Sequence, residues 1–506
     1  MKKTLIALAS VAALGAAHAD VTLYGVIDAA FGSTSSGLSS DGNNPSNANV
    51  FASNGQPIQS AVDQKQAIGR TTSMANGLLQ PSRWGIKGSE DMGGGLKANF
   101  VLESGLNIAN GSNPNDHALL ASVTSTGGVT GAGDSSLNGQ MFDRQASVGL
   151  SGDFGAVDVG FQLNLNGELN GLNDPLGGGY ISPLGTYGGL TGMGSSYSGR
   201  QSNSIKYAYS VGTTTIKAFY AMGGYSGNMG QGAQFGLASI MQVTPDLQID
   251  IGASAMKDNV SYGSALSGSL NTTQVGNGST AGASTSPYTP CAAAGNANLG
   301  ACVQNPIAGL SATYYNSSEV IVGANWQASA AVKVNVGYIQ VVQSNASNGA
   351  ADYLITQNLG VPIVQSSVNT SPYASNKTTS AYWIGGTYNI SNTDRVKVAY
   401  YGYQRSAYTA GSDAKTVGGT PGVSPATASV SAQYAQSQAP MFGFVYDHDL
   451  SKKTDVYLAA NYQKFDNGNQ WATVYSDGTQ KSQSAGGNGL MGQSISFIGA
   501  GLRVKF

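Results

Sequence analysis

The chain has 506 residues, of which 71 are glycine and only 10% are charged, against roughly a quarter charged in ordinary soluble proteins. The mature part has no stretch near the ~20 apolar residues of a spanning helix, no G-X-Y repeat, and scattered bases with a net charge of −2, which argues against nucleic-acid binding. A large all-β protein remains, with a mean hydropathy of −0.11 and a low charge that needs a reason.

The N-terminus has the pattern of a secretory signal peptide. Lys2 and Lys3 precede an apolar run that ends near Ala17, and Ala17-His18-Ala19 offers a small-x-small cleavage site. We therefore expect residues 1–19 to be removed, which leaves an exported chain, 20–506, with a formal net charge of −4.

Segments of alternating apolar and polar residues recur along the exported chain, with almost no helical signal. Lys333-Val334-Asn335-Val336-Gly337-Tyr338 is typical of them. The pattern predicts sixteen strands, near residues 20–31, 80–90, 94–107, 140–152, 155–163, 200–211, 213–223, 233–243, 246–257, 318–328, 331–341, 379–390, 393–404, 440–450, 453–465 and 494–506.

The connections between these strands alternate in length. Short turns, such as Glu90–Gly94 and Leu450–Lys453, alternate with long Gly/Ser/Asn-rich stretches, so all turns lie at one end of the sheet, together with both termini. An even strand number sorted in this way predicts a 16-stranded antiparallel transmembrane β-barrel with short periplasmic turns and long extracellular loops. The apolar face of each strand then points to lipid and the polar face to a wet lumen.

Few side chains could carry chemistry of another kind. Cys291 and Cys302 lie in one long stretch, where an oxidising compartment favours a disulfide; without a nearby histidine they do not complete a metal site. His117 lies in a Gly/Asn/Ser loop, and His448 stands beside a turn, where a surface hydrogen bond is expected. We therefore predict neither enzyme activity nor a cofactor nor a metal.

The last strand alternates from Ile498 to an aromatic C-terminus, Phe506. This pattern resembles the signal that outer-membrane barrels present to their insertion machinery.

Several motifs then match a known family in order along the chain. They are Val21–Asp28, Ser82–Ala98, Leu102–Gly105, Arg144–Gly152, Asn203–Tyr207 and Gly499–Phe506. The chain resembles the general porins of beta-proteobacteria, of the Burkholderia, Neisseria and Comamonas type. The resemblance implies a homotrimer of sixteen-stranded barrels in the lipid and lipopolysaccharide of a Gram-negative outer membrane, where ions and small hydrophilic solutes diffuse passively.

In that family the third extracellular loop folds inward and narrows the channel. Residues 164–199 correspond to it here, with Glu168 and Asp174 as its acids. The family's inward bases correspond by motif position to Arg83, Arg144 and Arg200, and Lys87 shares the face of Arg83. The resemblance implies that these bases face the loop carboxylates across the narrowest water, which creates a transverse field.

Two observations leave parts of this interpretation open. Arg144 shares its parity with the apolar residues of its strand, so only the family register turns it inward. Phe161 stands where family members usually carry arginine, which leaves the usual anion preference undecided. A substrate-specific channel, or a barrel whose long loops act as an adhesin or receptor, would have a similar sequence.

Overall fold

The computed structural model describes residues 20–35, 70–109, 111, 141–186, 190, 193, 199–223, 230, 232–265, 310–347, 363–369, 371–409, 432–434, 436–464, 471–474, 480–482 and 494–506. The predicted signal peptide, Cys291 and Cys302 lie outside these residues, as does His117. Within this part of the chain, no helix has both the length and the apolar character needed to cross a membrane.

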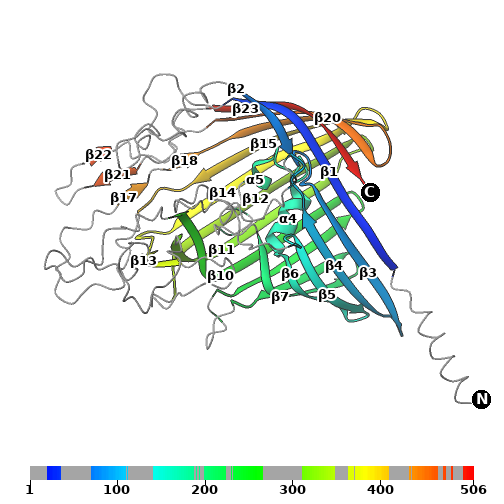
Figure 1. Ribbon diagram of the computed structural model, residues 1–506, viewed down its shortest axis with the longest axis horizontal. Coiled ribbons are helices and arrows are strands. Elements are labelled where there is room, and N and C mark those ends of the chain that lie inside the picture. The colour runs from blue at the N-terminus through cyan, green and yellow to red at the C-terminus, as the bar shows by residue number, and fades with distance from the viewer. Residues whose placement is uncertain are drawn as a thin grey trace, which may run out of the picture.

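Sixteen strands of the described residues close into one antiparallel barrel (Figure 1). β1 (Asp20–Ser35) closes it, because it pairs with β23 (Ser494–Lys505) on one side and with β2 (Arg70–Asn76) and β3 (Arg83–Gly93) on the other. β2 and β3 form one wall strand interrupted at 77–82.

The other wall strands follow in chain order. They are β4 (Leu96–Gly105), β5 (Gln145–Gly152), β6 (Gly155–Leu163), β7 (Arg200–Val211), β8 (Thr214–Ala221), β9 (Gln234–Thr244), β10 (Leu247–Ala265), β11 (Leu310–Gln327), β12 (Val332–Asn345), β14 (Lys377–Asn389), β15 (Asp394–Arg405), β18 (Ser437–Gln438) with β19 (Met441–Asp449), and β20 (Thr454–Lys464). All sixteen predicted strands overlap a wall strand, which confirms the predicted fold class.

The prediction was wrong at some strand ends. β10 and β11 extend well into the stretch 258–317, where Ser and Asn residues weaken the apolar alternation but the backbones remain paired. Short strands also lie in stretches predicted to be loops: β13 (Ile363–Asn369) pairs in parallel with β11, whereas β16 (Tyr408–Thr409), β17 (Ala432–Tyr434), β21 (Trp471–Val474) and β22 (Gln480–Ser482) form a separate small sheet.

The short connections all lie at one end of the barrel, here called the turn end, where β1 begins and β23 finishes (Figure 1). The strand pairs joined there are β3–β4, β5–β6, β7–β8, β9–β10, β11–β12, β14–β15 and β19–β20. The opposite end is the loop end. The predicted sorting of turns and loops is confirmed.

The two faces of the wall differ as the alternation predicts. On β5, Val148 is 56% exposed, whereas its neighbours Ser147 and Gly149 are buried on the inner side. On β9, Phe235 and Leu237 are likewise exposed and Gln234 is buried. The outer face is therefore apolar, as a surface in contact with hydrocarbon must be.

The apolar core lies inside the barrel, between the wall and the segment that follows β6. This segment contains α4 (Leu165–Asn173) and α5 (Pro183–Thr186). Asn164 caps α4 by accepting a hydrogen bond from Gly167 N at 2.8 Å. The sequence analysis missed this helix, because it is short and contains three asparagines and two glycines; such a helix depends on tertiary packing, here of Leu165 and Leu169.

Candidate site in the lumen

Residues 164–186, here called the inner loop, lie against the inner wall, and Figure 1 shows α4 within the ring of strands. Glycines on four wall strands make room for it. A β-carbon would lie 2.6 Å from Leu169 at Gly252, 2.2 Å from Asn173 at Gly323, 2.7 Å from Pro175 at Gly385 and 2.4 Å from Leu176 at Gly443. These glycines belong to β10, β11, β14 and β19, so the inner loop follows the circumference of the wall.

Hydrogen bonds from the wall hold the inner loop along this path. Trp383 Nε1 on β14 donates to Asn173 O at 2.8 Å, and Asn461 Nδ2 on β20 donates to Ile181 O at 3.4 Å. Ile181 N then donates to Leu78 O, between β2 and β3, at 3.0 Å. The inner loop thus covers the wall from β8 to β20, reaches Lys206 of β7 through Glu168, and leaves the inner faces of β3 to β6 for the open side of the lumen.

Three bases predicted from the motifs lie on this open side, grouped around Glu103 of β4. Arg144 Nε donates to Glu103 Oε1 at 2.7 Å, and Arg83 Nε lies 3.5 Å from Oε2. Tyr24 donates its hydroxyl proton to Oε2 at 3.0 Å. Arg200 Nε donates to the carbonyl oxygen of Arg144 at 2.9 Å. We call Arg83, Arg144, Arg200 and Glu103 the arginine cluster.

The side chain of Arg144 points toward the lumen for a local reason. Arg144 precedes β5 in a bend, so the alternation of that strand does not govern its side chain. Alternation is also interrupted beside Arg200, where the pairing of β6 with β7 shifts register after Gly160 and Asn203 has a φ of 54°. Lys87 is exposed on the inner face of β3, with its Nζ 5.3 Å from the centre of the Tyr24 ring.

Glu168 of α4 is held by two lysines rather than by the arginine cluster. Its carboxylate accepts from Lys217 of β8 at 2.7 Å and from Lys206 of β7. Burial raises the pKa of Glu168, but the two ammonium groups outweigh it and hold the pKa below its ordinary value. We call Glu168, Lys206 and Lys217 the lysine clamp.

Asp174 lies at the far end of α4, on the wall side of the inner loop. Tyr401 OH donates to Asp174 Oδ1 at 2.6 Å, and the backbone N–H groups of Leu176 and Gly178 donate at 3.0 and 2.9 Å. Burial raises the pKa of Asp174, and these hydrogen bonds only partly offset it. This carboxyl group shapes the inner loop and does not face the arginine cluster.

Sequence reasoning singled out neither Glu103, Lys206 nor Lys217 as a site residue, although a signal for them exists. Lys206 lies between Ile205 and Tyr207, and Lys217 lies between Ile216 and Ala218. A charged residue flanked by two lipid-facing residues must point into the lumen. Alternation does not reveal which carboxylate such a lysine contacts in the lumen.

A second group of acids lies near the turn end. Asp447, Asp449 and Asp455 bring carboxylate oxygens within 4.8 Å of one another, while His448 points to the opposite face and contacts Asp394 at 2.7 Å. Arg503 Nε donates to Asp455 at 3.0 Å, and Arg395 Nε donates to Asp447 at 3.0 Å. Because guanidinium groups already neutralise these acids, the group is an ion-pair network.

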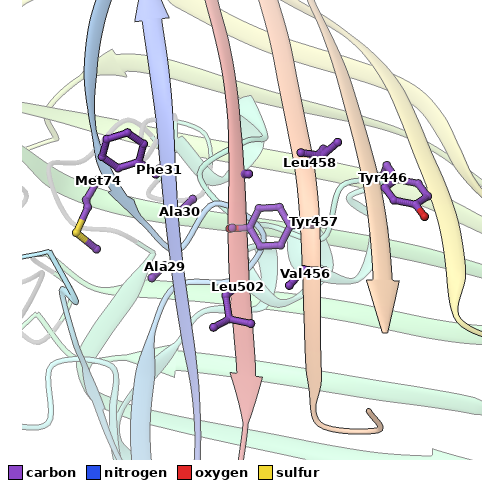
Figure 2. A pocket seen from close by; sticks show the side chains of 11 residues that line it. Ala29, Ala30, Phe31, Met74, Tyr446, Val456, Tyr457, Leu458 and Leu502 are labelled. Atoms are coloured by element: carbon purple, nitrogen blue, oxygen red, sulfur yellow. The ribbon is translucent and has the colours of Figure 1, made fainter. Parts of the chain in front are cut away.

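The outer face carries an open apolar hollow of about 520 Å³ where the barrel closes. Figure 2 shows Phe31 and Met74 beside β1 on one side and Leu458 beside β20 on the other, with Leu502 of β23 between them. Small residues, including Ala29 and Ala500, form its floor. The hollow offers apolar contact and no chemistry of its own.

Residues 4–468 match the Gram-negative porin family. An outer membrane porin protein of Bordetella pertussis is 35% identical over 184 residues, which cover 36% of this chain and 38% of that protein. Outer membrane porin protein 32 of Delftia acidovorans is 31% identical over 229 residues, covering 45% and 50%. The matches thus span half or less of these curated relatives.

Among solved structures, an anion-selective porin from Comamonas acidovorans superposes with a TM-score of 0.55 at 16% identity, covering 97% of this chain and 100% of that one. This likeness concerns the fold alone. The family match extends over most of the chain and agrees with the closed sixteen-stranded barrel and its apolar outer face. The chain belongs to the Gram-negative porin family, whose place is the outer membrane.

Proposed function

We propose that this protein is a general diffusion porin, through which ions and small hydrophilic solutes cross the outer membrane passively. The observation that supports this proposal most directly is the path of the inner loop. It covers the wall from β8 to β20 and leaves the arginine cluster on the uncovered side, so that water and solutes pass between the two. The inner loop is the narrowing element, and no chemical step is involved.

The charges along this passage favour anions. The arginines that contact Glu103 outnumber this carboxylate, so the arginine cluster has a net positive charge. The two lysines that contact Glu168 also have Asp158 of β6 beside them, opposite Lys206, so that group is close to neutral. The exposed Lys87 adds another base. Glu168 is already paired with lysines, so it does not present a free negative charge to the pore. The field across the pore therefore comes from the larger number of basic side chains on the side of the arginine cluster.

The same proposal includes the assembly. We propose a homotrimer embedded in lipid and lipopolysaccharide, inserted by the outer-membrane barrel machinery through the strand that ends at Phe506. Phe506 is exposed, and its backbone exchanges hydrogen bonds of 3.1 Å with Gly25, which fixes the C-terminus at the outer rim of the turn end. The disulfide between Cys291 and Cys302 and the removal of residues 1–19 remain predictions.

Planar-bilayer recordings of the purified protein test this function. We expect ohmic conductance steps in groups of three and a reversal potential in a KCl gradient that favours chloride. Arg83→Ala and Arg144→Ala should each shift that potential toward cations, because each removes a lumenal charge. A folded, heat-modifiable barrel without conductance would refute the transport function, and unchanged potentials in both variants would refute the role of the arginine cluster.

A further inference from the structure

Polar atoms without partners are concentrated beneath α4. Within the described part of the chain, neither carboxylate oxygen of Glu319, neither amide atom of Asn166 and not the hydroxyl of Ser254 has a hydrogen-bond partner of normal geometry. Their residues are only 1%, 0% and 6% exposed. Leaving a buried polar group unsatisfied is unfavourable, and more so when the group is charged. Such a concentration points to a ligand.

The three residues converge from three elements. Ser254 of β10 and Glu319 of β11 are opposite each other in the antiparallel register, and both point inward. Asn166 of α4 faces Glu319, and its Oδ1 would lie 3.4 Å from a β-carbon at Gly252, the preceding inward residue of β10. The Ser254 hydroxyl lies on the side of Gly236 of β9, so it would have to rotate about its Cα–Cβ bond to face Glu319 of β11.

We propose that Glu319, Asn166 and Ser254 bind a hard divalent cation of the calcium class, which fastens α4 to the barrel wall. A bidentate carboxylate, an amide oxygen and a hydroxyl supply up to four oxygen ligands, and water completes the shell of six to eight that Ca²⁺ takes. Oxygens that share one cation direct their lone pairs at the cation rather than at donors within the chain, which accounts for carboxylate and amide oxygens without hydrogen-bond donors.

Two other buried carboxylates of the lumen show why Glu319 differs. Asp174 accepts hydrogen bonds from Tyr401 and two backbone N–H groups. Asp250 accepts two from Gln248, at 3.0 and 2.9 Å. The acids near the turn end are bound by arginines. Each of these carboxylates has donors of normal geometry within the chain, whereas Glu319 has only the side chain of Asn166 beside it, without a hydrogen bond of normal geometry.

Calcium binding to the whole folded protein in lipopolysaccharide-free detergent tests the site. One carboxylate among the ligands predicts a dissociation constant of about 10⁻⁴–10⁻³ M. We expect CaCl₂ at about 10 mM, well above that range, to raise the unfolding temperature relative to EDTA, and calorimetry to show one saturable site. Glu319→Gln should weaken binding at least tenfold, whereas Asp250→Asn, which removes the same charge from the neighbouring strand, should bind as the wild type does.

Asn166→Asp supplies a test in the opposite direction, and it serves if Glu319→Gln does not fold. A second carboxylate should tighten Ca²⁺ binding about tenfold, because ligand charge governs affinity. No Ca²⁺ effect on the wild type, equal loss in Glu319→Gln and Asp250→Asn, or unchanged affinity in Asn166→Asp would each overturn the proposal. None of these readouts depends on conductance, so the diffusion function is tested separately.

Discussion

Glu103 and Glu168 each lie between two cations supplied by different elements. Glu103 contacts arginines from β3 and from the bend before β5, and Glu168 contacts lysines from β7 and β8. A carboxylate in such a position orients the long basic side chains and also cancels part of their charge. The selectivity of the pore therefore depends on these acids as much as on the bases.

Glu103→Gln should increase the preference for anions. A unit charge about 8 Å away in water changes the energy of an anion and of a cation by about 0.5 kcal/mol each, in opposite directions, so the anion-to-cation permeability ratio should rise about sixfold at low salt. Reversal potentials in a salt gradient measure it. Glu90→Gln, on the same strand pair near the turn end, removes an equal charge outside the arginine cluster and should leave the ratio unchanged. An equal shift in both variants would contradict a local effect.

The lysine clamp should release under acid conditions. Because the pKa of Glu168 lies below its ordinary value of 4.5, its ion pairs stabilise the docked loop fully above that value, and this stabilisation disappears as the pH falls through the lowered pKa. We expect single-channel current noise to rise on acidification in the wild type. Glu168→Gln should be noisy at every pH; an acid-induced rise of the same size in that variant would assign the effect to another group.

At the scale of elements, α4 owes its position to the wall. Its sequence has low helix propensity, and its apolar side chains and the residues after it enter spaces left by inward glycines on β10, β11, β14 and β19. The glycines of the strands are therefore part of the loop's binding surface. A side chain at one of them should displace the loop without disturbing the outer face.

Gly323→Val tests this dependence. Its β-carbon would lie 2.2 Å from Asn173, so the inner loop must move toward the water-filled side, and single-channel conductance should fall or fluctuate. Ala324→Val adds similar volume on the adjacent, outward-facing position of β11 and should leave conductance at the wild-type level. Unchanged conductance in Gly323→Val would mean that the inner loop does not limit the passage.

At the scale of the whole molecule, closure joins strands from the two ends of the chain. Asp28 of β1 accepts a hydrogen bond from Tyr457 of β20, and it also accepts the N–H groups of Leu79 and Gln80 at 2.9 and 2.8 Å. This buried carboxylate thus links the seam of the barrel to the segment on which the inner loop ends. Loss of one of its donors should weaken the closed barrel.

Tyr457→Phe should lower the stability of the folded barrel by about 1–3 kcal/mol, the cost of leaving a buried acceptor short of a donor. The transition from folded to unfolded mobility in a heated gel series, or a urea titration in detergent, measures the change. Tyr462→Phe, on the exposed outer face of the same strand, should unfold as the wild type does. Equal stability of both variants would show that Asp28 does not need this hydrogen bond.

Much of the architecture was predictable because a membrane barrel obeys local rules. Lipid on one side and water on the other impose a period of two on every strand, so residues such as Val148 and Leu237 could be assigned to the outer face directly. Turns and loops sort to opposite ends because successive connections of an antiparallel barrel alternate between its two ends. The inward position of Arg83 and Lys87 also follows from alternation.

The partners inside the lumen were not predictable in this way. Alternation shows that Lys206 and Lys217 point inward, but only the path of the inner loop brings Glu168 to them and carries Asp174 to Tyr401. That path depends on spaces left by glycines from strands far apart in the sequence, and the burial of Glu319 depends on it too. The sequence by itself determined which side of the wall each residue occupies, because the two solvents act on every strand separately; the tertiary structure alone decided which charges meet, because that requires many strands and one inner loop to pack together.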